Sequence, residues 1–370
     1  MTDLQHTSLH DRHVALGAKL ADFGGWEMPI EYPGGGVLAE HSAVRGRVGV
    51  FDVGHLGKAS VRGPGALDFV NAALTNDLRK VGPMQAQYTL CCDEETGGVV
   101  DDLIAYVRDD DEVYLIPNAA NTTGVVARLA DAAPAGIQVD NLHAALGVIA
   151  VQGPRSADLL GAVGLPAPSA YMSWVAGEWH GHHLMVARTG YTGELGFELV
   201  PRAEDAGELW DAVLAAGTAY DALPCGLGAR DTLRTEMGYP LHGHELSMDI
   251  TPNQARAGWA VGWDKPAFWG REVLAKEKEA GAARLLWGLE STDRGIPRQG
   301  MRVTHGGEPV GEVTSGTFSP TRKQGIGLAL LARGVVIGDE VTVDVRGRES
   351  TMKVMRPPFV DAHVKDDVAP

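Results

Sequence analysis

The chain has 370 residues, of which 44% are hydrophobic and 22% are charged, an ordinary balance for a globular protein. Its formal net charge of -16 excludes nucleic acid and anionic membranes as main partners, because both repel an acidic protein. The length predicts roughly two or three domains. The 48 glycines and 20 prolines indicate many turns and therefore much β structure.

The three cysteines, Cys91, Cys92 and Cys225, form no paired spacing and no CxxC motif. This pattern predicts a cytoplasmic protein without disulfides or a zinc site, and we expect no bound metal. Residues 1–5 lack the apolar core of a signal peptide. No apolar run approaches ~20 residues, so no transmembrane helix is expected.

The first predicted elements are two helices and a strand. Apolar residues at helical spacing predict a helix over 8–20. A glycine loop at 34–36 opens a second helix over 37–45, and no Walker lysine follows it, so phosphate binding is not favoured. A strand over 48–53 comes next. His55 in the turn after it is either functional or a histidine satisfied by the backbone, and we favour the second interpretation.

A half-repeat is visible in the middle of the chain. Residues 59–64 and 149–154 each predict a strand that ends in Gly-Pro and leads into a helix, where proline is tolerated in the first turn. Antiparallel strands mixed with helices predict an α+β body rather than a Rossmann fold, because no GxGxxG follows a strand. Two more strands are predicted after each helix, at 85–92 and 98–107, then at 183–189 and 196–200.

The strand over 98–107 follows the turn glycines Gly97 and Gly98 and carries two adjacent carboxylates, Asp101 and Asp102, among apolar residues. Successive side chains of a strand point to opposite faces. A buried carboxylate is costly unless it is paired or hydrogen-bonded. We therefore expect Asp101 to be a pocket-facing catalytic group. For Asp102, capping of backbone amides at the turn is an equal alternative.

Further polar groups follow in the second half of the chain. A glycine turn between strands presents the carboxylate Glu194. Arg230 and Arg234 share one face of the next predicted helix, and they are either buried structural pairs or anion clamps. Residues 285–360 alternate apolar and polar side chains with frequent glycines, which predicts a small all-β domain at the C-terminal end.

Several motifs, taken jointly and in this order, carry a resemblance over about residues 8–362. On these motifs the chain resembles the T-protein family of the glycine cleavage system, the folate-binding aminomethyltransferases. The motifs are Asp22-Phe23 with Trp26 and Pro29, Phe51-Asp52-Val53, Gly97-Gly98 with Asp101-Asp102, Gln152-Gly153-Pro154, Gly190-Tyr191-Thr192-Gly193-Glu194, Gly226-Leu227-Gly228-Ala229-Arg230-Asp231-Thr232-Leu233-Arg234 and Thr314-Ser315-Gly316-Thr317-Phe318-Ser319-Pro320.

The resemblance implies a three-domain cloverleaf around a central folate pocket. Two interleaved α+β domains are expected over 1–280, and an all-β barrel with a jelly-roll-like form over 285–362. The implied reaction moves the aminomethyl carbon from the lipoyl arm of H-protein to tetrahydrofolate, which gives 5,10-methylenetetrahydrofolate and ammonia. The expected partners are therefore tetrahydrofolate, as co-substrate, and lipoylated H-protein, with no metal.

The resemblance also implies the site residues. Asp101 is the implied catalytic carboxylate near the pterin, and its neighbour Asp102 is implied to be structural. The implied folate-binding residues are Glu194 on the amino and ring N–H groups of the pterin, Arg230 near the folate to stabilise negative charge, and Tyr88 and Asn118 in the pocket wall.

Two other functions on the same fold stay open. One is a folate-dependent demethylase of a small methylated substrate, although the chain has no fused flavin domain. The other is a non-catalytic folate-binding assembly factor of the iron–sulfur type. Such factors typically carry a cysteine motif in their C-terminal half, and here Cys225 is the only cysteine after position 92.

Overall fold

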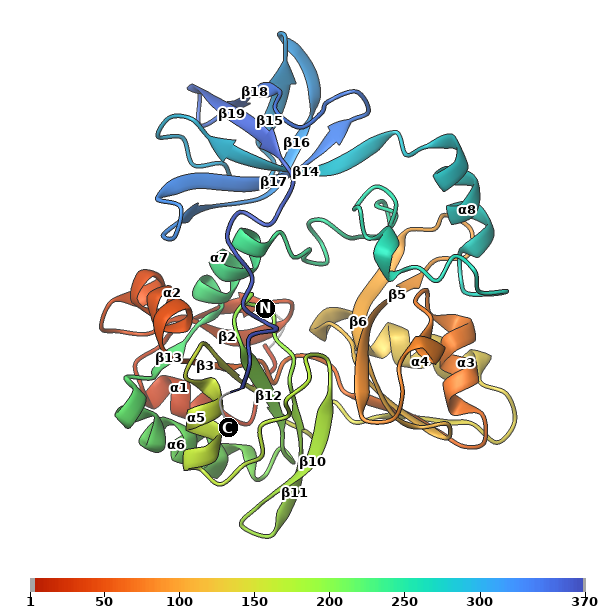
Figure 1. Cartoon of the computed structure of the whole chain (residues 1–370), viewed down its shortest axis with the longest axis vertical. Helices are drawn as coiled ribbons and strands as arrows, with labels where there is room; N and C mark the ends of the chain where they lie inside the picture. The colour runs from red at the N-terminus through yellow and green to blue at the C-terminus, as the bar shows by residue number, and fades with distance from the viewer. Residues whose placement is uncertain (1–3, 369–370) are drawn as a thin grey trace.

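The structure is a computed structural model and describes residues 4–368. The chain forms three lobes, two built from sheets and helices and the third a closed β-barrel (Figure 1). This is the predicted α+β cloverleaf with a C-terminal barrel. Among the described residues, no helix has the length and apolar character that crossing a membrane requires.

The first lobe, in orange and yellow in Figure 1, is a five-stranded antiparallel sheet with the order β5-β6-β7-β4-β8. Two helices bury Val70 and Leu129 against Leu103 and Ala105 of β6 on one sheet face. The elements are β4 (Ala59–Arg62), α3 (Ala66–Ala73), β5 (Gln85–Cys92), β6 (Val99–Asp109), β7 (Glu112–Ile116), α4 (Thr122–Ala132) and β8 (Gln138–Asn141), with short turns η1 (Leu78–Lys80) and η2 (Ala119–Asn121).

The second lobe is a six-stranded mixed sheet with the order β10-β11-β12-β9-β3-β13, in which only the β13–β3 pair is parallel. Helices α5 and α6 bury Leu160 and Trp210 on one face. Helices α2 and α7 bury Val44 and Leu233 on the other. The elements are α2 (Gly36–Gly46), β3 (Gly49–Asp52), β9 (Ile149–Gln152), α5 (Ser156–Ala162), β10 (Trp174–Trp179), β11 (His182–Ala187), β12 (Gly196–Val200), α6 (Ala206–Gly217), η3 (Thr218–Tyr220), β13 (Leu223–Cys225) and α7 (Leu227–Met237).

The predicted half-repeat is confirmed, with one copy in each sheet lobe: β4 leads into α3, and β9 leads into α5. The glycine at each junction has a positive φ, 127° at Gly63 and 130° at Gly153. A Cβ at Gly63 would lie 2.1 Å from a backbone carbonyl oxygen, and one at Gly153 would lie 2.5 Å from another. Only glycine therefore fits either junction.

The third lobe is a closed barrel with the strand order β14-β17-β16-β15-β18-β19, reached through η4 and α8. Its observed strands run from Arg284 to Met355, and the division into 1–280 and 285–362 stays a prediction. The elements are η4 (Gly258–Ala260), α8 (Arg271–Ala280), β14 (Arg284–Ser291), β15 (Arg302–His305), β16 (Glu308–Ser319), β17 (Gln324–Ala332), β18 (Glu340–Asp344) and β19 (Glu349–Met355).

The N-terminal helix differs from its prediction over 8–20. The chain forms a shorter helix, α1 (His10–Ala15), followed by a hairpin of β1 (Lys19–Phe23) and β2 (Trp26–Glu31). Gly17, with a φ of 71°, lies just past the end of α1, where a left-handed residue terminates a helix. The spacing of the apolar residues in 16–23 is therefore compatible with a strand as well as with a helix.

Candidate active site

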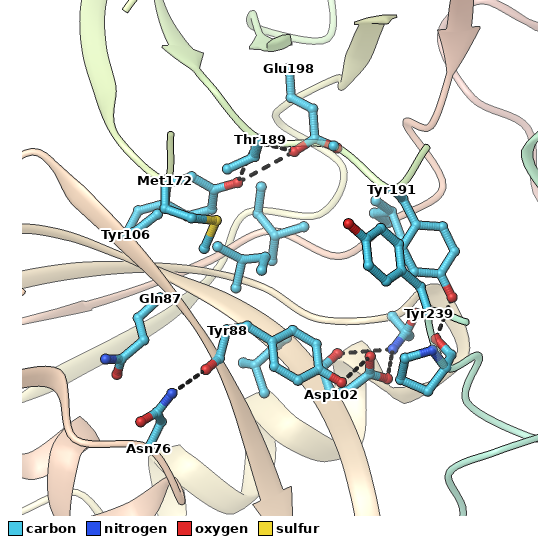
Figure 2. A pocket seen from close by; sticks show the side chains of 18 of the residues that line it. Asn76, Gln87, Tyr88, Asp102, Tyr106, Met172, Thr189, Tyr191, Glu198 and Tyr239 are labelled. Atoms are coloured by element: carbon cyan, nitrogen blue, oxygen red, sulfur yellow. Dashed lines mark hydrogen bonds between the residues drawn. The ribbon is translucent and has the colours of Figure 1, made fainter. Parts of the chain in front are cut away.

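A cavity of about 370 Å³ lies between the two sheet lobes and the segment that follows α7 (Figure 2). Its walls come from β5 and β6 on one side, and from the turn after β11 and β12 on the other. The volume is that of a small-molecule site. The lining is mainly apolar and aromatic, with two carboxylates, Asp102 and Glu198, and the guanidinium of Arg230.

The alternation of β6 decides which aspartate reaches this cavity. Asp102, Ile104 and Tyr106 line it. Asp101 is fully buried on the opposite face of the strand, the face on which Leu103 packs in the core of the first lobe. The orientation predicted for the pair was therefore wrong. The prediction could not choose a face by polarity, because apolar residues occupy both faces of this strand.

Asn118 holds both aspartates, and lies in the cavity wall as predicted. Its Nδ2 donates to Oδ1 of Asp101 at 2.9 Å and to Oδ1 of Asp102 at 2.8 Å. Asp101 also accepts from the Asn118 backbone N–H at 2.9 Å and from Nδ2 of Asn121 at 2.7 Å. Asp102 accepts from the Tyr88 hydroxyl at 3.0 Å, and Tyr88 also lines the cavity as predicted.

The electrostatics of this pair follow from burial among neutral donors. Burial raises the pKa of both carboxyls, and repulsion from Asp102 adds to the shift at Asp101, which brings its pKa to about 8. The hydrogen bonds from Tyr88 and Asn118 offset part of this shift at Asp102. The two groups are close enough to titrate as a unit.

The second carboxylate of the cavity is Glu198, which the sequence analysis did not single out. It lies on β12 and accepts from the hydroxyls of Thr189 and, at 3.5 Å, Tyr106. Burial raises its pKa, and Arg230 offsets part of that shift. Figure 2 shows Glu198 and Asp102 at opposite ends of the site. Glu198 lies four residues after the Gly-Tyr-Thr-Gly-Glu motif, on the strand predicted over 196–200. A carboxylate on that strand, so close to the motif, was the signal from which the sequence could have identified it.

Glu194, predicted to hold the ligand, lies elsewhere. It is 5% exposed, and its Oε1 accepts from Nη1 of Arg45 at 2.9 Å. Arg45 also bonds Glu236, so Glu194 belongs to an ionic cluster between α2 and α7 rather than to the cavity wall. The residue predicted to hold the pterin N–H groups is therefore not among those that line the cavity, because its carboxylate faces Arg45.

The spacing of the two arginines of α7 left two roles open, a buried structural pair or an anion clamp, and the two residues differ in their surroundings. Arg234 is 1% exposed and donates to Glu245 at 2.9 Å and to Asp231 at 2.6 Å, so it is a structural pair. Arg230 lines the cavity as predicted, with its guanidinium carbon 4.4 Å from the ring centroid of Tyr191. Stacking on an aromatic face leaves guanidinium N–H groups free for an acceptor.

Aromatic rings complete the walls, and the sequence analysis missed most of them. Tyr88 stacks on Trp259, with ring centroids 5.2 Å apart, and Tyr191 packs on Tyr239 at 5.7 Å. All four rings line the cavity, and Trp259 is 66% exposed. Flat rings beside a slot favour a flat, conjugated ligand. A single tryptophan in a helical turn as short as η4 gives no pattern from which this placement could be predicted.

His55 also departs from its expected environment. It is 1% exposed, and neither ring nitrogen has a hydrogen-bond partner among the described residues. Burial lowers its pKa to about 3, with a further contribution from Arg230. The favoured interpretation, a histidine satisfied by the backbone, was therefore wrong. The neutral ring packs edge-on against Phe23 at 5.4 Å, so it fills space as an apolar group does.

Comparisons with known proteins agree with one another. Residues 9–265 match the GCVT N-terminal domain, and 284–361 match the glycine cleavage T-protein C-terminal barrel domain. The chain is 68% identical to the aminomethyltransferase of Parafrankia sp. (strain EAN1pec), over 98% of this chain and 99% of that protein. It is 59% identical to that of Mycobacterium avium (strain 104), with 97% of each chain covered.

A crystal structure of the glycine cleavage system aminomethyltransferase T from Bartonella henselae aligns with a TM-score of 0.91 at 32% identity. The alignment covers 97% of this chain and 99% of that one, so all three lobes share their arrangement with it. Two domain matches that together span most of the sequence, and full-length relatives well above 30% identity, lead to one conclusion: the chain belongs to the glycine cleavage T-protein family of aminomethyltransferases.

Proposed function

We propose that this chain transfers the aminomethyl carbon from the lipoyl arm of H-protein to tetrahydrofolate, and that the cavity between the lobes binds the folate. The observation that carries the proposal is a pair of half-buried carboxylates, Asp102 and Glu198, at opposite ends of an aromatic slot. Their protein partners are mainly neutral hydroxyl and amide groups. Such carboxylates have acceptor capacity left for a heterocycle rich in N–H groups.

At one end, Glu198 is the proposed acceptor for the amino and ring N–H groups of the pterin. A carboxylate can accept two parallel N–H bonds, and these charge-assisted bonds are stronger than neutral ones. The hydroxyl of Thr189 holds one carboxylate oxygen of Glu198 in place. We therefore transfer the pterin-binding role from Glu194, which is already paired with Arg45, to Glu198.

At the other end, Asp102 is the proposed catalytic carboxylate. When the carbon–sulfur bond of the lipoyl adduct breaks, the sulfur leaves as the thiolate of the dihydrolipoyl arm and an iminium-like carbon forms. Attack by one folate nitrogen releases a proton, and attack by the second nitrogen on the same carbon expels ammonia and closes the methylene bridge. A carboxylate held by Tyr88 and Asn118 stabilises that positive charge without reorganising. It can also accept the proton. Asp101 then acts as the structural partner that orients Asn118 from behind the strand.

The direct test is an assay of 5,10-methylenetetrahydrofolate formation from aminomethylated H-protein and tetrahydrofolate. We expect turnover that depends on both substrates, and a rise in melting temperature with tetrahydrofolate alone, because a ligand of the folded state stabilises it. Turnover of a free methylated amine in place of aminomethylated H-protein would instead indicate a demethylase. Folate binding without any transfer would indicate the non-catalytic alternative.

A further inference from the structure

Three potential metal ligands meet on the surface of the second lobe, away from the cavity. The N-terminal segment runs alongside the β1–β2 hairpin: the Gln5 N–H donates to Gly25 O, and the Glu27 N–H donates to Gln5 O, each at 2.9 Å. This pairing places His6 beside Glu27. The first residue of α1, His10, reaches the same carboxylate from the other side.

The three side chains converge on one point. Nε2 of His6 lies 3.2 Å, and Nε2 of His10 lies 2.7 Å, from the same oxygen, Oε2 of Glu27. One ligand atom of each residue lies within 4.8 Å of the other two. The two imidazole rings are stacked, with centroids 3.7 Å apart and 7° between their planes, so their Nε2 atoms face the carboxylate side by side.

We propose that His6, His10 and Glu27 form a site for a divalent transition-metal ion of the zinc type. Two imidazole nitrogens and one carboxylate oxygen are a donor set that zinc accepts. Zinc–ligand distances of about 2.0–2.2 Å in a tetrahedral site separate neighbouring ligand atoms by roughly 3.4 Å. The His6 spacing to Glu27, 3.2 Å, is close to this value, whereas the His10 spacing of 2.7 Å is shorter, so the His10 ring and the carboxylate would separate slightly to admit the ion. A modest rotation of the His6 ring would direct both imidazole lone pairs at one ion.

Two more features suit a metal site. The His6 side chain is 50% exposed, so solvent can supply a fourth ligand. The other ring nitrogen of His10, Nδ1, lies 3.5 Å from a carboxylate oxygen of Asp11. A metal-bound histidine usually directs its second nitrogen at such a carboxylate, which orients the ring. Hard cations such as Mg²⁺ prefer oxygen ligands and do not fit this set.

The ion would act as a clamp rather than in catalysis. Glu27 lies on β2. The residues on either side of it in that strand, Trp26 and Met28, pack against Leu227, the first residue of α7. Binding would therefore fasten the N-terminal segment to the hairpin that supports the helix carrying Arg230. This role is independent of the folate reaction, and it predicts a gain in stability with little change in turnover.

The test uses the full chain, stripped of metal with a chelator and titrated with Zn²⁺ alone. Calorimetry should give about one ion per chain, and the melting temperature should rise with Zn²⁺ but not with the same concentration of Mg²⁺. His6→Ala and Glu27→Gln should each weaken Zn²⁺ binding by at least the ~10-fold typical of losing a supporting group. His6 is half exposed and Glu27→Gln is conservative, so both variants should fold, which their response to tetrahydrofolate checks.

Two matched histidine controls locate the ion. His305→Ala alters an exposed histidine at the end of β15 and should leave Zn²⁺ affinity unchanged. His182→Ala alters the exposed hairpin of β10 and β11 and should also leave it unchanged. The proposal is overturned if Zn²⁺ gives neither binding heat nor a thermal shift. It is equally overturned if the affinity survives His6→Ala and Glu27→Gln, or is lost with His182→Ala.

Discussion

Glu236, in the cluster between α2 and α7, and the two carboxylates of the cavity differ in how the fold compensates their charge. In the cluster between α2 and α7, Glu236 is fully buried and accepts from Nε2 of His41 at 2.9 Å and from Nη2 of Arg45 at 2.6 Å. These partners outweigh burial and lower its pKa to about 2. In the cavity, Asp102 and Glu198 have mainly hydroxyl and amide donors, and burial raises the pKa of both.

The difference separates a carboxylate that is paired with cations inside the fold from carboxylates that are held mainly by neutral donors. A buried carboxylate that is paired with a cation inside the fold has its charge compensated. Removing either partner leaves the other as an unpaired charge in a medium of low dielectric constant. A buried charge held by neutral donors stays costly, and a ligand with positive charge or N–H groups can relieve that cost. The cluster also ties the lobes together, because Ser319 of the barrel donates to Glu236 at 2.5 Å.

The largest effect should come from breaking the cluster. We expect Glu236→Gln to destabilise the protein by about 3–5 kcal/mol, because Arg45 and His41 lose their buried counter-charge. The folded-state pKa of Glu236 is depressed, so its contribution is present above its usual pKa and is lost as pH falls toward about 2. Denaturant unfolding at several pH values measures this. The control Glu290→Gln breaks a partly exposed pair with Arg322 and should cost less than ~1 kcal/mol.

The next effect tests the reactive end of the cavity. Asp102→Asn should lower turnover by about 10²–10³, because charge that develops in the reaction loses its stabilising group. Its melting temperature should change little. Asp101→Asn is the matched control: it should lower stability by roughly 1–3 kcal/mol and keep turnover per folded molecule within about tenfold. A folded, inactive Asp101→Asn together with an active Asp102→Asn would reverse the assignment.

A smaller effect is expected when Glu198 on β12 is compared with Glu194 in the glycine turn before that strand. Glu198→Gln should raise the dissociation constant for tetrahydrofolate by about 10–100-fold, since hydrogen bonds to a charged group contribute ~1.5–3 kcal/mol. Glu194→Gln should change it by less than about threefold, because its partner is Arg45. Equilibrium folate titrations of both variants decide this. Stronger loss at Glu194 would return the pterin-binding role to that residue.

The smallest effect concerns the pH dependence of the aspartate pair. The pKa of Asp101 is raised to about 8, so its contribution to stability is present below its usual pKa and is lost as pH rises through about 8. Asp101→Asn should therefore flatten the fall in melting temperature between about pH 4 and pH 8. Asn121→Ala, which removes one donor and keeps both titratable carboxyl groups, should retain that fall. If the melting temperatures of Asp101→Asn and the unmodified protein changed in parallel with pH, the titration of Asp101 would not be the cause of the fall.

Much of the architecture could be predicted from local pattern. Apolar runs predicted most strands of the two sheet lobes, but not β8, β10 or β13, and alternating apolar and polar residues predicted the barrel. The paired Gly-Pro junctions revealed the half-repeat, because only glycine tolerates the close backbone approach at Gly63 and Gly153. The same reasoning failed at 8–20, where spaced leucines suited a helix and a strand equally and Gly17 ended the helix early.

The sequence by itself determined the family, the buried strand with two acids and the region of the cavity, with Tyr88, Asn118 and Arg230 correctly placed. Only the tertiary structure decided which carboxylates face the cavity. A strand with apolar residues on both sides has no inherent inner face. Helices α3 and α4 cover one side of β6, and that packing turns Asp101 into the core and Asp102 to the cavity. Arg45, distant in sequence, likewise pairs with Glu194 and leaves the cavity to Glu198.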